Sequence, residues 1–136
     1  MSSISTIALS GMNAAARRLE VSASNVANVM STGALSNADG TVPAGAPRAY
    51  APLELVQTAS AGGGTQTTVT TATPSTVAVS DPQAPFANQD GLVAAPNVDL
   101  SQEMVGQMIA SYSFAANATV MKADDRMTRM LLNITA

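Results

Sequence analysis

Apolar residues recur at helical spacing near the start of the chain. Their separations alternate between three and four residues, which is the a/d pattern of a coiled coil, and the pattern persists for about three heptads. Gly33 follows at the position where a glycine commonly ends a helix. The pattern predicts a helix of about 25 residues within the segment 1–33. Its apolar stripe, here called the N-terminal seam, consists of Leu9, Met12, Ala16, Leu19, Ala23, Val26 and Met30.

A second helical pattern fills the segment 98–136. Pro96 prevents an earlier start, and Asn97, Asp99 and Ser101 are candidate N-caps, with Gln102 in capping-box register after Asp99. No proline follows, so we expect a helix of about 35 residues, or roughly 50 Å. At 100° per residue one face collects the C-terminal seam, which consists of Val105, Met108, Tyr112, Ala116, Val120, Ala123, Met127, Met130 and Ile134.

Residues 34–97 separate the two helices and hold all seven prolines. Three stretches in this segment, "RAYAPLELVQ", "TQTTVTTAT" and "STVAVS", are rich in β-branched residues with some alternation, which predicts short strands. The ranges 43–47 and 62–64 are expected to be flexible. The fragments "NADG" and "NQDG" are interpreted as turns, because neither continues to the glutamate that closes a calcium-binding loop.

These elements define a fold class that is mainly α with a small β insert. We expect an N-terminal coiled-coil helix (1–33), a β/loop insert with short antiparallel strands (34–97) and a C-terminal coiled-coil helix (98–136). The two terminal helices are expected to pair as a coiled coil and to form one structural unit. Each seam alone would be marginal in water, so we expect the seams to be buried against each other and against neighbouring molecules.

The composition favours assembly over an isolated globule. Hydrophobic residues make up 46% of the chain but aromatic residues only 3%, and alanine, which buries little area, supplies much of the total. Charged residues are 11%, against roughly 25% in ordinary soluble domains, which suits a surface that packs against other protein. The alternative is a freestanding small helical binding protein, whose helices close on themselves.

Charge and hydropathy argue against several partner classes. The net charge is -3 with six Lys and Arg residues, so there is no basic footprint for nucleic acid or anionic lipid. No stretch reaches the roughly 18 apolar residues of a membrane span, so we predict no direct membrane insertion. The N-terminus lacks a basic region followed by a continuous apolar run. We therefore expect no cleaved signal peptide, and export would need another route.

Catalytic chemistry is poorly represented. The chain has no His and no Cys, which removes imidazole bases, thiolate nucleophiles and the usual transition-metal ligands. Asp124 and Asp125 are adjacent, but helical neighbours point about 100° apart and do not converge on a substrate. They are expected to meet Arg17 and Arg18 or another subunit. We predict no enzymatic activity, no metal site and no cofactor.

The stretch "SASNVANVMSTG" (22–33) combines seam residues with Ser and Asn, which are weak helix formers. These small, uncharged groups stand where a soluble helix would normally carry Lys and Glu. They permit the close approach of several neighbours at once. Asn25 and Asn28 are therefore interpreted as subunit-contact residues.

Two stretches at opposite ends of the chain share motifs with one protein family. Residues 8–33 carry Asn-x-x-Asn, here Asn25 and Asn28, followed by Thr-Gly. Residues 81–134 carry Pro-Asn-Val-Asp, Glu-Met, Tyr112 with Asn117, and Lys-x-x-Asp. Both stretches resemble the bacterial flagellar axial proteins, the rod and hook family. The short length and the run "DGLVAAPNVD" are most similar to the proximal-rod type, whereas the Gly- and Thr-rich middle departs from the family pattern.

The resemblance implies a structural role without catalysis. Proteins of this family assemble helically through their terminal helices into the rod that crosses the periplasm and transmits torque to the hook. The implied partners are other copies of the chain, other flagellar rod proteins and the flagellar type III export apparatus. A different rod or hook position within the same family is the alternative.

Overall fold

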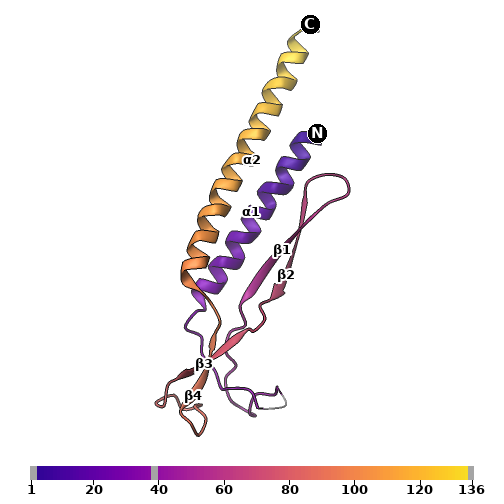
Figure 1. Ribbon diagram of the computed structural model, residues 1–136. Coiled ribbons are helices and arrows are strands. Elements are labelled where there is room, and N and C mark those ends of the chain that lie inside the picture. The colour runs from indigo at the N-terminus through magenta and orange to yellow at the C-terminus, as the bar shows by residue number, and fades with distance from the viewer. Residues whose placement is uncertain (1–2, 38–39, 135–136) are drawn as a thin grey trace. The chain divides into compact units, whose positions relative to one another are not determined.

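The computed structural model describes residues 3–37 and 40–134. Two long helices lie at the ends of the chain, and four short strands come between them in sequence (Figure 1). The predicted class, mainly α with a small β insert, is confirmed. In chain order the elements are α1 (Ser3–Ala27), β1 (Leu53–Ala59), β2 (Thr65–Thr71), β3 (Thr76–Ser80), β4 (Leu92–Pro96) and α2 (Leu100–Ile134).

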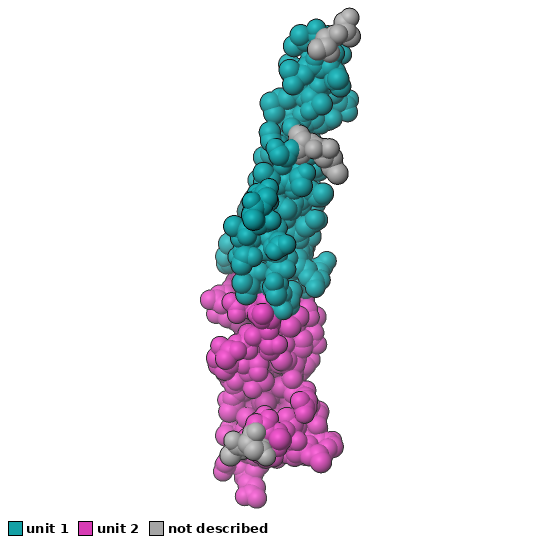
Figure 2. All heavy atoms as spheres, turned by 90° about the vertical axis from the view of Figure 1, so that its right-hand side faces the viewer, with its two compact units in different colours: residues 1–21, 55–69, 104–136 teal, residues 22–54, 70–103 magenta. Residues whose placement is uncertain are grey.

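The chain divides into two compact units, which Figure 2 shows in different colours. Unit 1 comprises residues 1–21, 55–69 and 104–136, and unit 2 comprises residues 22–54 and 70–103. Each unit therefore takes one part of α1, one part of α2 and part of the intervening segment.

In unit 1 the two helices run side by side in opposite directions (Figure 1). Small residues form the contact, since Ala8, Ala15 and Ala110 are all buried. A methyl group on Gly11 would lie 2.6 Å from the Asn117 side-chain oxygen, which shows how closely the helices approach there. The predicted pairing of the terminal helices is thus present within unit 1. It does not use the predicted seams, because large side chains would hold the backbones apart.

A hairpin of unit 1 lies against α1. β1 and β2 form a two-stranded sheet, and the turn between them is closed by bonds from Ser60 N–H to Gly64 C=O (3.1 Å) and from Gly63 N–H to Ser60 C=O (2.9 Å). Thr65 N–H donates to the Ser10 hydroxyl at 3.1 Å, which fixes the turn to the helix. Residues 62–64 thus form a turn held by backbone and side-chain bonds, and the prediction that they are flexible stays a prediction.

In unit 2, β3 and β4 pair antiparallel with Val79 opposite Val93 and Ala78 opposite Ala94. Val93 and Ala94 are the most deeply buried apolar residues described in this unit, at 1% and 4% exposure. β4 was not predicted. Its run "LVAAP" does not alternate because the adjacent residues Val93 and Ala94, whose side chains point to opposite faces of the strand, are both buried.

The end of α1 differs from the prediction. The helix ends at Ala27. The Asn28 backbone N–H makes the last helical bond to the Ser24 carbonyl (3.1 Å), and the Asn28 side-chain amide donates to the same carbonyl (2.9 Å). Met30, predicted as the last seam residue, lies in the turn beyond the helix and is 84% exposed. Gly33 is not a helix cap either. It exchanges two backbone bonds with Ala94, at 2.9 and 2.8 Å.

Gly33 occupies a site with no room for a side chain. A methyl group there would lie 2.6 Å from the Pro47 carbonyl oxygen and closer still to backbone atoms of Arg48 and Ala49. We expect Gly33→Ala to lower the free energy of unfolding by about 1–3 kcal/mol, because backbone must move to admit it. Urea unfolding followed by circular dichroism measures the loss. Gly62→Ala is the matched control, since its methyl group would meet nothing within 4 Å, and an equal effect of both variants would contradict the argument.

The start of α2 agrees with its predicted cap. The Asp99 carboxylate accepts the backbone N–H groups of Ser101 at 2.8 Å and Gln102 at 3.1 Å. These bonds satisfy donors that have no partner inside the first turn. Asp99 is thus the N-cap among the three candidates, and the helix begins at Leu100.

Candidate subunit interface

The N-terminal seam faces outward along most of its length. Leu9 and Leu19 are 38% and 45% exposed although both are large and apolar. Ala16 and Ala23 are also exposed, whereas Met12 and Val26 are half-buried. The face that α1 buries is formed instead by other residues of the helix, namely Ala8, Ala14, Ala15, Val21, Ser22 and Asn25. The N-terminal seam therefore remains open in the single chain.

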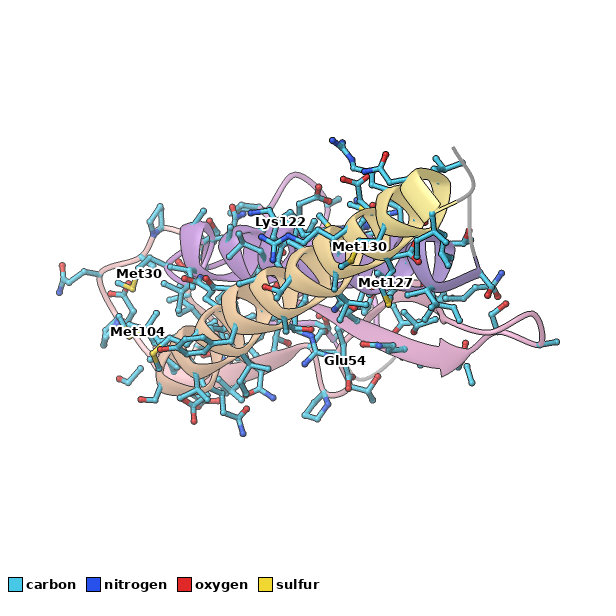
Figure 3. The ribbon with its side chains drawn as sticks, turned by 90° about the horizontal axis from the view of Figure 1, so that it is seen from above. Met30, Glu54, Met104, Lys122, Met127 and Met130 are labelled. Carbon is cyan, nitrogen blue, oxygen red and sulfur yellow. The ribbon has the colours of Figure 1, made fainter. Side chains whose placement is uncertain are left out.

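The C-terminal seam is exposed throughout. The exposed fractions run from 46% at Val120 to 80% at Ile134. At 100° per residue the charged residues Lys122, Asp125 and Arg129 project from the other side of α2. Figure 3 shows Lys122 and Met127 on opposite sides of the helix. All members of this seam are exposed, namely Val105, Met108, Tyr112, Ala116, Val120, Ala123, Met127, Met130 and Ile134.

Asn25, predicted as a subunit-contact residue, makes hydrogen bonds within its own chain. Its side chain is 3% exposed and lies inside unit 2. The amide nitrogen donates to Leu53 C=O (2.9 Å) and to the Glu103 carboxylate (2.6 Å), and the amide oxygen accepts Leu53 N–H (2.9 Å) and the Tyr50 hydroxyl (3.0 Å). All four partners of Asn25 lie in its own chain. Its predicted role as a subunit-contact residue gains no support from the single chain and stays a prediction.

Asn25 and its partners Tyr50, Leu53 and Glu103 form a hydrogen-bonded cluster, here called the Asn25 cluster, to which Ser22 and Ser24 also belong. The hydroxyl groups of Ser24 and Tyr50 lie 3.0 Å apart, and the Ser22 hydroxyl donates to Glu103 C=O at 3.2 Å. The cluster joins α1, the segment before β1 and the first turn of α2 within unit 2. Asn28 is half-buried, and its side-chain amide donates to Ser24 C=O at the end of α1. Its contact role stays a prediction.

The acidic pair on α2 does not meet the arginines of α1. Arg17 pairs with Glu20 at 2.7 Å, and Arg18 donates to the Gln57 side chain at 3.3 Å. Asp125 pairs with Arg129 at 3.1 Å. Asp124 is buried and accepts the Ser5 hydroxyl in unit 1. Arg17 and Asp125 thus have partners one turn away on the same helix, whereas Arg18 and Asp124 have partners elsewhere in the chain. The predicted contact between the acidic pair and the arginines within the chain was wrong.

The structure assigns no catalytic arrangement to the remaining polar motifs. In "NQDG", the Asn88 side-chain oxygen accepts the backbone N–H groups of Asp90 (3.0 Å) and Leu92 (2.8 Å), so the turn interpretation is confirmed. "NADG" lies partly outside the described residues. Across residues 3–37 and 40–134 no three acidic side chains gather as metal ligands, and no described helix is apolar enough to cross a membrane.

Several exposed apolar residues lie outside both predicted seams. Ile109 (52%) and Leu131 (66%) extend the open surface of the C-terminal seam, whereas Phe114 (42%) and Leu132 (64%) lie on the other side of α2. A heptad template takes one residue per turn and so passes over Ile109 and Leu131, which directly follow Met108 and Met130. A wider apolar face, as on helices with more than one neighbour, would have included them.

Known proteins match both ends of the chain. Residues 6–34 match the family described as "Flagella basal body rod protein". Residues 89–134 match the family described as "Flagellar basal body rod FlgEFG protein C-terminal". These ranges contain both seams in full.

Curated relatives extend the similarity over most of the chain. The flagellar basal-body rod protein FlgC of Escherichia coli O6:H1 is 36% identical over 85% of this chain and 83% of its own length. The FlgC protein of Buchnera aphidicola is 31% identical over 96% of this chain and 95% of its own. That of Bacillus subtilis is 43% identical over 41% of this chain and 37% of its own. The chain therefore belongs to the flagellar basal-body rod proteins, and within them to the FlgC type.

Proposed function

We propose that this rod subunit assembles helically through the seams of its terminal helices into the proximal rod. The rod then crosses the periplasm and transmits torque to the hook. The proposal builds on the family, whose members form the basal-body rod, and on the open seams of α1 and α2. Assembly partners are further copies of this chain and other rod proteins.

The amount of exposed surface carries the proposal. The chain exposes 9046 Å², whereas a folded monomer of 13.7 kDa exposes about 6,600 Å². The excess is about 2,400 Å², and a standard interface takes about 800 Å² from each partner. Much of it belongs to large apolar side chains on both helices. Such an excess supports contacts with several neighbours at once.

We also propose that the chain has no enzymatic activity and passes through the flagellar type III export apparatus unfolded. The shallow core supports this route. In the described part of the chain, the buried apolar residues are mostly alanines, and Val93 is the largest fully buried side chain. Because a single copy buries little apolar area, its free energy of unfolding is small. Unfolding before export therefore requires little free energy.

Amide exchange of the full chain tests the assembly proposal. In dilute solution we expect rapid exchange at the end of α2, from Met127 to Ile134, where no neighbour covers the seam. In assembled rods the same amides should be protected. Val93 and Ala94 in β4 are the internal control, because they are buried in the single chain. Full protection of both helices in dilute monomer would favour a freestanding binding protein instead.

A further inference from the structure

Two grooves flank the contact between α1 and α2 in unit 1. Ala15 and Ala110 lie at the contact itself and line both grooves. The first groove, here called the Phe114 groove, has a volume of about 260 Å³ and is otherwise lined by Ala16, Leu19, Ser111 and Phe114. Because Ala16 and Leu19 belong to the N-terminal seam, that seam opens on this side of the helix pair.

The C-terminal seam opens on the other side. The second groove is lined by Gly11 and Ala14 of α1, by Ile109 and Ser113 of α2, and by residues of the hairpin. On a helix, residues spaced by four, seven and eleven share one face, so Ile109 lies on the face of Val105, Ala116 and Val120. The two seams of one subunit therefore point away from the helix pair on opposite sides.

We propose that the N-terminal seam of one copy, with its Phe114 groove, packs against the C-terminal seam of a second copy. This inference rests on the proposed function and specifies the partner and geometry of its interface. Because the two surfaces are different and lie on opposite sides, the contact is heterologous. Each added copy presents a new free seam, and such a contact repeats into a ring or a helix instead of closing as a two-fold dimer.

The chemistry of the two surfaces supports a second copy as the occupant. The Phe114 groove is lined by small residues, alanine and serine, together with the large side chains of Leu19 and Phe114. Large apolar side chains such as Val120 and Met127 are half-exposed on the opposite surface and suit such a groove. The excess exposed area of about 2,400 Å² is enough for one standard face on each side of the subunit. A heterologous contact needs two such faces.

Disulfide cross-linking tests this contact, because the natural chain has no cysteine to interfere. Cells would express two full-length variants together, one with Leu19→Cys and the other with Val105→Cys, Val120→Cys or Met127→Cys, the three positions covering the unknown register. After mild oxidation we expect a cross-linked dimer in at least one mixture, and none from Leu19→Cys alone. Lys122→Cys is the matched control, since Lys122 projects from the other side of α2 and should give no dimer.

The outcomes separate this inference from the proposed function. Dimers of Leu19→Cys with itself would show a two-fold contact and overturn the heterologous geometry. Motile cells without a disulfide in any of the three mixtures would show that another protein covers the seam, which overturns the second copy as occupant. In both cases assembly through the seams would stand. The proposed function itself fails if charges placed in both seams leave rod assembly intact.

Discussion

Leu19→Asp is expected to abolish rod assembly and leave the cells non-motile. Leu19 is 45% exposed in the single chain, so an aspartate there remains hydrated before assembly and costs the monomer little. In the assembled rod the same carboxylate would be enclosed by apolar side chains without a partner. Burying an unpaired charge costs about 3 kcal/mol or more, and the penalty recurs at every copy.

The measurement combines swimming motility with isolation of basal bodies, and circular dichroism of the purified variant confirms unchanged helix content. Asn13→Asp is the matched control, because Asn13 is an exposed position of the same helix outside the N-terminal seam. It introduces the same charge and should leave motility intact. Met127→Asp should repeat the defect from the C-terminal seam. Normal motility of cells with Leu19→Asp and of cells with Met127→Asp would contradict the assignment of both seams as subunit interfaces.

The helices were predictable because their signals are local. The N-cap Asp99 precedes an uninterrupted run that contains no proline, and its carboxylate makes the expected bonds to Ser101 and Gln102. A heptad pattern identifies an apolar face but not the element that covers it. The helix pair of unit 1 uses alanines and Gly11, which contribute little to any hydrophobic pattern. The large residues of the two seams therefore take no part in the contact between α1 and α2 and remain exposed.

The parts that escaped prediction depend on distant contacts. β4 has no alternation because Val93 and Ala94, on opposite faces of the strand, are both buried by parts of the chain distant in sequence. Asn25 was recognised as unusual for a helix, but its partners Leu53 and Glu103 lie 28 and 78 residues further along the chain. Sequence spacing alone gives no indication of such a cluster. The same amide pattern is compatible with a contact inside the chain or between chains.

Asn25→Ala is expected to destabilise unit 2 by about 3–5 kcal/mol, because it removes four hydrogen bonds and leaves buried partners unpaired. The Leu53 N–H and C=O both lose their partner, and the Glu103 carboxylate loses a donor. A domain of this size has about 5–15 kcal/mol in total, and the shallow core of this chain places it toward the low end, so the variant would lose most of its stability. Urea unfolding followed by circular dichroism gives the free energy, and exchange of the Leu53 amide reports the cluster directly.

Three comparison variants separate the cluster from a general effect of losing an asparagine. Tyr50→Phe removes one hydroxyl from the Asn25 oxygen and should cost only about 1 kcal/mol. Asn28→Ala removes the bond to Ser24 C=O at the end of α1 and should have a similarly small effect. Asn25→Asp keeps the shape and the acceptor for Leu53 N–H, but it replaces the donor 2.6 Å from Glu103 with a second carboxylate. It should therefore resemble Asn25→Ala despite its conservative size. If Asn25→Ala were as mild as Asn28→Ala, the amide would be dispensable inside the chain, and its role would return to contacts between subunits.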